Sequence, residues 1–322
     1  MDAIEDKRIL LLTGKGGVGR SIVTAALAHI AQRRGRRVLV AELGDDPDDY
    51  SPLARYFGRD RLPVDPEELA PGIRGVVLLA RTGQDLFLRQ VLRSSTLSRA
   101  ALGSDPIRRL LSAGPSFREM GIFFQLLALL RLPHRDGGHE HEVVIVDMPA
   151  TGHALSLTGL PDLLLRLVPG GPIADALREG KGYLNDPAQS AAWVVTLPET
   201  LPVSECLELL AGLRRTEMPI GGVFLNRFPV DAYTPEERAA LAPILAQHDV
   251  LGAETFNRPG LAHRETTRLR ASTDAPIYVL PEVPHAHVVA ALTEAAERAW
   301  LLPRPASSAS PAPAATPANG TP

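Results

Sequence analysis

A glycine-rich loop between an apolar run and a helical run is the feature that most constrains how this chain folds. The stretch from Leu10 to Ala28 reads LLLTGKGGVGRSIVTAALA, and its apolar start is of strand length and ends at Gly14. The loop follows the pattern G-x-x-x-x-G-K-[ST], except that Arg20 stands where lysine is usual. Such glycines let backbone N–H groups turn inward around a polyphosphate, beside the positive end of the next helix. The stretch therefore predicts a strand, a phosphate-binding loop and a helix.

Six further apolar runs predict a parallel sheet covered by helices. They are apolar on both faces and are separated by helical periods, which is typical of the α/β class with a doubly wound, mostly parallel sheet. We expect one domain over residues 1–302, with a helical insertion at 82–132, where no good strand is present. Residues 303–322 are rich in Pro, Ala and Ser and predict a disordered tail. The six runs are RRVLVAEL, IRGVVLLA, EVVIVDMP, AAWVVTLP, IGGVFLN and APIYVLP.

Composition excludes several classes of protein. The formal net charge is -3, so the chain lacks the basic excess of a nucleic-acid-binding protein. Neither a signal peptide nor an apolar run long enough to span a bilayer is present, which predicts a cytoplasmic protein without stable membrane insertion. The single cysteine, Cys206, excludes an intrachain disulfide and is expected on the buried face of a helix. We interpret His134, His139 and His141 as part of a solvated loop rather than as metal ligands.

Two residues near the loop have the chemistry of a Mg²⁺ site. Ser21 follows the loop at the position where a hydroxyl ligates Mg²⁺ beside bound phosphates. Asp147 ends the apolar run EVVIVD, and we expect it to hold a Mg²⁺-bound water from the carboxyl end of its strand. The sequence thus predicts ATP and Mg²⁺ as ligands.

The motif GKGGVG is narrower than the general loop and resembles the deviant loop of the dimeric ATPases that include MinD, ParA, nitrogenase iron protein and ArsA. The resemblance implies that Lys15 crosses a dimer interface and contacts the phosphates bound by the partner, which makes Lys15 a catalytic residue. It also implies which residues surround the nucleotide. These are Gly14, Lys15, Gly16, Gly17, Val18, Gly19, Arg20, Ser21 and Ile22.

A second motif, DMPATGHALSLTGLP, is similar to the second switch of the ArsA and tail-anchored-protein-targeting ATPases. This resemblance implies that Thr151, Gly152 and His153 form a switch that senses the γ-phosphate. Two shorter segments, VFLNRF and YVLPEVPH, resemble the base-binding segments of the same family, which implies that Asn226 and Pro281 lie against the adenine.

The chain departs from this family at two places. Arg20 replaces a lysine that holds phosphate oxygens, and arginine is longer and planar. The family's first switch reads S-T-D-P, where this chain has VAELGDDP. An ungapped match places Gly44 on the aspartate that positions the attacking water, whereas a match on the Asp-Pro pair selects Asp46. Because Asp45 and Asp46 both remain nearby, we predict that one of these carboxylates reaches the water.

Three functions remain open from the sequence. The first is a nucleotide-gated dimeric ATPase of the ArsA-like group, paired with itself or with a paralogue, that acts on an unidentified client protein. The second is a non-catalytic ATP-binding subunit that pairs with an active paralogue, and the third is a spatial-organisation ATPase of the MinD or ParA type. Apolar residues of the insertion either line a groove for an apolar or membrane-protein client or pack against neighbouring helices, and we favour packing. They are Phe123, Phe124, Leu126, Leu127, Leu129 and Leu130.

Overall fold

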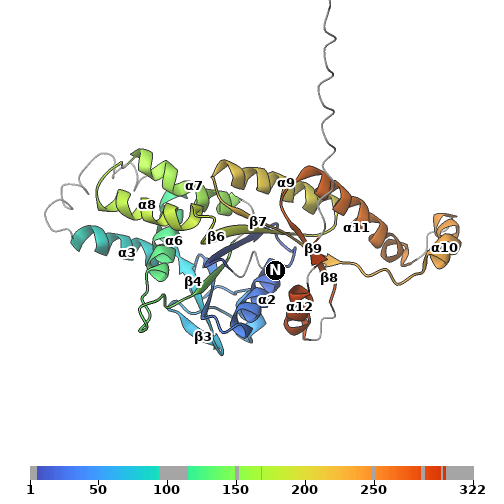
Figure 1. Cartoon of the computed structure of the whole chain (residues 1–322), viewed down its shortest axis with the longest axis horizontal. Helices are drawn as coiled ribbons and strands as arrows, with labels where there is room; N and C mark the ends of the chain where they lie inside the picture. Colours follow the sequence, from blue (N-terminus) through green and yellow to red (C-terminus); the bar gives the residue numbers. More distant parts are fainter. Residues whose placement is uncertain are drawn as a thin grey trace, which may run out of the picture.

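A single nine-stranded sheet forms the centre of the computed structural model, which describes residues 6–93, 115–148, 152–167, 169–247, 251–283, 287–298 and 300–301 (Figure 1). The strand order is β3-β4-β2-β5-β1-β6-β7-β8-β9, and seven strands run parallel between two antiparallel edge strands, β3 and β9. The strands are β1 (Ile9–Gly14), β2 (Val38–Gly44), β3 (Glu67–Ala70), β4 (Ile73–Leu79), β5 (Val143–Asp147), β6 (Ser190–Thr196), β7 (Ile220–Phe228), β8 (Ile277–Pro281) and β9 (Trp300–Leu301).

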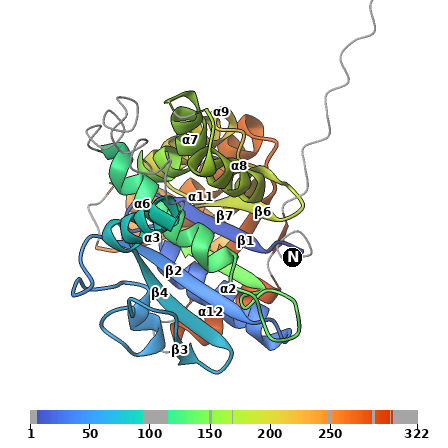
Figure 2. The ribbon, with the colours of Figure 1, turned by 90° about the vertical axis from the view of Figure 1, so that its left-hand side faces the viewer.

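Helices cover both faces of this sheet, as Figures 1 and 2 show. One face packs against α2 and α12, and the other packs against α6, α7, α8 and α9. The helices are α2 (Arg20–Arg33), α3 (Ala80–Arg93), α6 (Pro115–Leu130), α7 (Gly152–Leu167), α8 (Pro172–Asn185), α9 (Thr200–Arg215), α10 (Pro235–Gln247), α11 (Ala253–Ser272) and α12 (Val288–Glu297), with a short 3-10 helix, η1 (Ala54–Phe57). The predicted doubly wound α/β class is thereby confirmed.

All seven apolar runs form parallel strands, and the sequence missed only short edge strands among the described residues. Strand β3 has exposed or half-buried side chains throughout, and β9 has two residues, so neither carries an apolar run. A run buried on both faces is the sequence signal of an interior parallel strand, and edge strands lack it.

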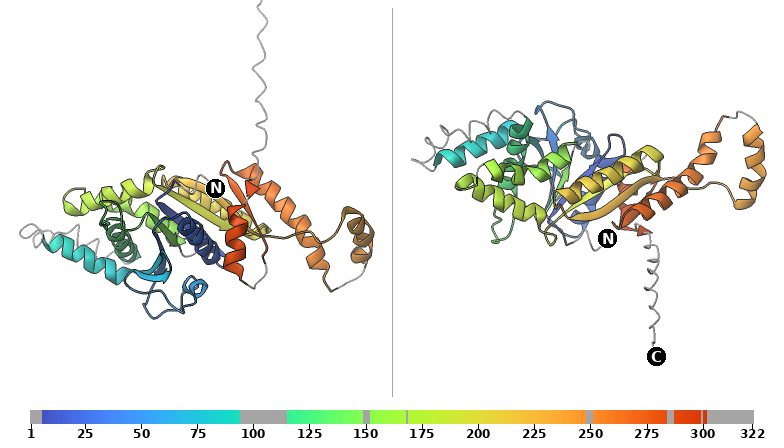
Figure 3. Two further views of the ribbon diagram at one scale, coloured as in Figure 1. Left: turned by 60° about the horizontal axis from the view of Figure 1, so that its bottom comes forward. Right: turned by 90° about the horizontal axis from the view of Figure 1, so that it is seen from above.

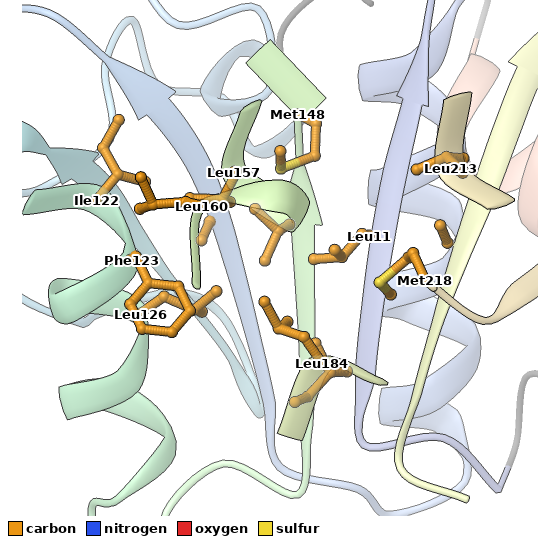
Figure 4. Close-up of a cluster of buried hydrophobic side chains, with 14 of the residues drawn as sticks. Leu11, Ile122, Phe123, Leu126, Met148, Leu157, Leu160, Leu184, Leu213 and Met218 are labelled. Atoms are coloured by element: carbon orange, nitrogen blue, oxygen red, sulfur yellow. The ribbon is translucent and has the colours of Figure 1, made fainter. Parts of the chain in front are cut away.

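The larger of two apolar cores lies between the sheet and helices α6 to α9 (Figure 4). Phe123 and Leu126 of α6 contact this core together with Leu157 and Leu160 of α7 and Leu184 of α8. The six apolar α6 residues that were candidates for a client groove are all buried there, so the packing interpretation is confirmed for them. Cys206 of α9 is also buried in this core, as expected, and burial raises the pKa of its thiol to about 12.

Helices α3 and α6 occupy the described ends of the predicted insertion, whereas residues 94–114 and the tail from 302 onward lie outside the described residues. Helix α10 has no buried residue and lies at the end of an arm that extends away from the sheet with the start of α11 (Figure 3). In the described part of the chain, no helix has both the length and the apolar character needed to cross a membrane.

Candidate functional site

Two carboxylates lie near the carboxyl ends of neighbouring strands, on the same face of the sheet. Glu42 of β2 lies opposite Asp147 of β5 in the strand register. Because side chains alternate along a strand, Glu42 continues the row of Val40, and Asp147 continues the row of Ile145. Val40 and Ile145 belong to the core that packs against α2. Both carboxylates therefore lie on the α2 face, at the carboxyl edge of the sheet.

Arg20, the first residue of α2, forms a buried ion pair with Asp147. The Arg20 Nε donates a hydrogen bond to Asp147 Oδ1, and Arg20 NH1 donates to the Gly14 carbonyl oxygen at 3.2 Å. Asp147 is 1% exposed, and among the described residues its Oδ2 has no hydrogen-bond partner. Burial raises the pKa of Asp147, against the opposing effects of the Arg20 charge and the Ser21 hydroxyl. The arginine that departs from the motif is thus bound to the carboxylate predicted to face Mg²⁺.

The loop itself is fixed by Asn226 at the end of β7. The Asn226 side chain is 2% exposed, and its Nδ2 donates to the Val18 carbonyl oxygen at 2.9 Å. Gly19 has a φ of +86°, a left-handed conformation that favours glycine, and a Cβ there would overlap Asn226 Nδ2. Helix α2 begins after Gly19 without a side-chain cap. Its first-turn N–H groups therefore face the loop without a competing side-chain acceptor, as an anion site requires.

Lys15 lies in an ion pair within its own chain. Its Nζ is 2.6 Å from Oε1 of Glu205, a residue of α9, and 38% of the Lys15 side chain is exposed. The other Glu205 oxygen, Oε2, is buried and has no hydrogen-bond partner among the described residues. The lysine that the resemblance assigns to a partner's site is therefore held, in the single chain, by a partly exposed contact.

Glu42 is a residue that the sequence reasoning missed. Its Oε2 accepts hydrogen bonds from the Ser51 hydroxyl and, at 3.3 Å, from the Leu53 backbone N–H. Burial, together with the negative charge of Asp147, raises the pKa of Glu42 to about 7, although the Ser51 hydrogen bond and the Arg20 charge oppose the shift. A signal was present in the sequence, because an acid in the run VLVAE interrupts an otherwise apolar strand two residues after Val40.

The acids that were predicted to reach the attacking water lie in an exposed turn after β2. Asp45 forms an ion pair with Arg118 of α6, and 77% of its side chain is exposed. Asp46 accepts a hydrogen bond from the Asp48 N–H at 2.9 Å and so stabilises the turn. Their contact with a water remains a prediction. Gly44, at the end of β2, provides no carboxylate.

Asn226 and Pro281, which are predicted to lie against the adenine, line one open cavity of about 1130 Å³ together with Ile22, which is predicted to surround the nucleotide. Ile22 comes from the first turns of α2, Asn226 from β7 and Pro281 from the end of β8. Tyr56 of η1 and Thr293 of α12 line the same cavity from other sides. A concave site where polar and apolar side chains converge is a candidate small-molecule pocket. The structure thus brings these residues together, and their contact with adenine remains a prediction.

The second switch is only partly described. Asp147 ends β5, and Gly152 begins α7 a few residues later. Thr151 lies outside the described residues, as does the side chain of His153. In the described part of the chain, no group of three or more His, Cys, Asp or Glu side chains is arranged to hold a metal ion. A cation at this edge would therefore need further ligands besides protein carboxylates.

Comparison with known proteins identifies the family to which this site belongs. Residues 9–266 match the CobQ/CobB/MinD/ParA nucleotide-binding domain, and the chain belongs to this P-loop NTPase family. The ATPase BagA of Mycobacterium tuberculosis is 30% identical over 240 residues, which cover 73% of this chain and 69% of that protein. A putative ATPase of Mycobacterium bovis matches to the same extent. The arsenical pump-driving ATPase of Escherichia coli is 27% identical over 267 residues, or 78% of this chain and 39% of that protein.

Proposed function

We propose that this chain is an ArsA-like ATPase that binds Mg-ATP at the carboxyl edge of its sheet and hydrolyses it as a dimer. The observation that carries the proposal is the position of Asn226. This side chain donates to Val18 of the glycine loop and also lines the large cavity with Ile22 and Pro281. The glycine loop and a cavity with room for a nucleotide base are therefore joined through one buried residue.

The residues of the site divide into three roles. Backbone N–H groups of the loop and the start of α2 bind the phosphates. Ser21 and Asp147 fit Mg²⁺, since a hydroxyl lies beside a buried carboxylate whose Oδ2 has no hydrogen-bond partner among the described residues. A bound Mg²⁺ would neutralise negative charge on the phosphates. Thr151 to His153 respond to the γ-phosphate, a role that rests on the resemblance.

Dimerisation is proposed through Lys15. If Lys15 contacts the phosphates of a partner chain, its ion pair with Glu205 has to open first. A partly exposed ion pair contributes only about 0.2–1 kcal/mol, so a triphosphate competes readily with Glu205 for the ammonium group. The similarity to the arsenical pump-driving ATPase, a distant relative, supports the proposal that the chain is ArsA-like. A client protein, apolar or membrane-bound, is proposed from the resemblance alone.

A second function is favoured by the Arg20–Asp147 ion pair. In this arrangement the loop cation and the predicted Mg²⁺ carboxylate bind each other, and Gly44 contributes no acid. A chain with such a site binds nucleotide through its backbone and stabilises an active paralogue without turnover of its own.

Steady-state ATP turnover of the purified chain with Mg²⁺ separates the two functions. If the chain is an ATPase, turnover should be lost in Lys15→Ala and retained in Lys7→Ala. Lys7 is the matched control, because its Nζ donates a hydrogen bond to the Pro187 carbonyl oxygen outside the site. Turnover that survives in Lys15→Ala would contradict the role across the dimer. ATP-dependent thermal stabilisation without turnover, unchanged in Arg20→Lys, would establish the second function instead.

A further inference from the structure

The predicted Mg²⁺ carboxylate, Asp147, has a second acid beside it. Glu42 and Asp147 are paired in register on adjacent parallel strands, and both lie on the face covered by α2. Neighbouring strands are about 4.8 Å apart, so two side chains on the same face at paired positions are direct neighbours. Arg20 at the start of α2 is the cation that lies against this pair, through Asp147 Oδ1. Two carboxyl groups thus share one guanidinium at the start of α2.

Each acid keeps one oxygen outside these contacts. The hydrogen bonds to Glu42 from Ser51 and Leu53 both end on Oε2, which orients the carboxyl group and leaves Oε1 outside them. Arg20 donates to Asp147 Oδ1, and Oδ2 is a buried acceptor with no hydrogen-bond partner in the described part of the chain. A buried acceptor without a partner is costly, and such atoms in folded proteins usually face a water or an ion.

We propose that Glu42 and Asp147 together form the protein side of the Mg²⁺ site, and that Glu42 is the additional carboxylate that binds the hydrated cation. This inference rests on the proposed nucleotide function. Mg²⁺ typically keeps several waters and is held by one or two carboxylates plus substrate phosphates. The described residues provide two acids and the Ser21 hydroxyl but no larger cluster of ligands. The cation is therefore expected to bind only together with the nucleotide.

Glu42 also compensates for the two departures from the family pattern, which are Arg20 in the loop and Gly44 in the first switch. Arg20 engages Asp147 Oδ1, so Asp147 has one oxygen left for the hydrated cation. Gly44, two residues beyond Glu42 in the same strand row, carries no acid. A glutamate at position 42 is longer than the serine that the resembled switch pattern has there, and it returns a carboxylate to this edge of the sheet. The lost acid and the added acid thus lie two residues apart on one strand.

The test is the dependence of nucleotide affinity on Mg²⁺, which needs no turnover. Affinity for fluorescently labelled ADP is measured in EDTA and in saturating Mg²⁺ for the full chain, Glu42→Gln and Asp48→Asn. Asp48 is an exposed acid paired with Arg61, so its substitution is a matched loss of charge outside the site. In Glu42→Gln the gain in affinity from Mg²⁺ should fall by about 10-fold or more, as is typical when an outer ligand of a metal is removed. The affinity in EDTA should stay unchanged, and Asp48→Asn should keep the full gain.

The outcomes separate this inference from the proposed function. A Glu42→Gln chain that binds ADP with the full Mg²⁺ gain would overturn the role of Glu42 and leave the nucleotide site standing. A wild-type chain that binds no nucleotide in either condition would remove the proposed function and this inference with it. Water-proton relaxation with Mn²⁺ and ADP checks the metal directly, and the enhancement should weaken in Glu42→Gln but not in Asp48→Asn. Circular dichroism of both variants confirms that they are folded.

Discussion

The two faces of the central sheet are alike along most of their length and differ at the carboxyl edge. On the face against α2, apolar rows end in Glu42 and Asp147, whereas on the opposite face Leu43 and Met148 continue the large apolar core. Each apolar residue is the next residue after one of the acids, because successive side chains along a strand point to opposite faces. At this edge the strand residues on the α2 face combine packing with charged chemistry, whereas Leu43 and Met148 on the opposite face provide packing. Substitutions on the two faces should therefore separate nucleotide binding from stability.

The largest effect is expected for Gly19→Ala on the α2 face. Alanine at position 19 is strained in the left-handed backbone conformation, and its methyl group overlaps Asn226 Nδ2. The loop is therefore displaced from its hydrogen bond with Asn226. We expect a loss of about 2–3 kcal/mol in stability from backbone strain and lost hydrogen bonding. A loop misplaced by about 1 Å should also lower nucleotide affinity by a factor on the order of 100.

Gly16→Ala is the matched control for this prediction. A Cβ at Gly16 has no neighbour within 4 Å, so the nucleotide-free melting temperature should stay near that of the wild type. Thermal unfolding without nucleotide measures both variants. Equal melting temperatures for Gly19→Ala and Gly16→Ala would contradict the contact between the loop and Asn226.

A smaller effect, on stability alone, is expected for Gly180→Ala on the opposite face. A Cβ at Gly180 of α8 overlaps the ring of Phe123 in the large core, and overpacking of this kind costs about 1–3 kcal/mol. In the same helix Gly182 is exposed and has open space around it, so Gly182→Ala should stabilise the chain by about 0.5–1 kcal/mol. Urea unfolding measures both. Affinity for ADP should be unchanged in each, and a weaker affinity in Gly180→Ala would break the separation of the two faces.

The last expected effect is a pH dependence from Glu42. Burial and the charge of Asp147 raise its pKa to about 7, so the folded chain holds this proton more tightly than the unfolded chain. The resulting stabilisation is fully present below the unfolded pKa of about 4.3 and is lost as the pH rises through the folded pKa. Between about pH 5 and about pH 8, the wild type should lose on the order of 2–3 kcal/mol relative to Glu42→Gln. Urea titrations at both pH values measure the difference, and parallel profiles would argue against a raised pKa.

Much of the fold and part of the site could be predicted from the sequence, because local apolar patterns specify the strands. The contacts between residues far apart in the chain could not be predicted. Parallel strands are visible because both of their faces are apolar, and Asp147 is visible because an acid ends such a run. The Arg20–Asp147 and Lys15–Glu205 ion pairs join residues 127 and 190 positions apart, and no local pattern specifies which acid meets which base. The two-residue spacing of Val40 and Glu42 placed this acid on the buried face of the strand. The resemblance to the first switch, however, selected Gly44 and the acids after it as candidates.

We propose that the α2 face ends in a nucleotide site built on the loop and Asn226. Isothermal titration calorimetry of the full chain with ATP and Mg²⁺ tests it most directly. We predict saturable binding of one ATP per chain that is retained in Gly180→Ala and strongly weakened in Gly19→Ala. Absence of binding by the wild type, or equal binding by all three proteins, would show that no nucleotide binds at the loop and Asn226.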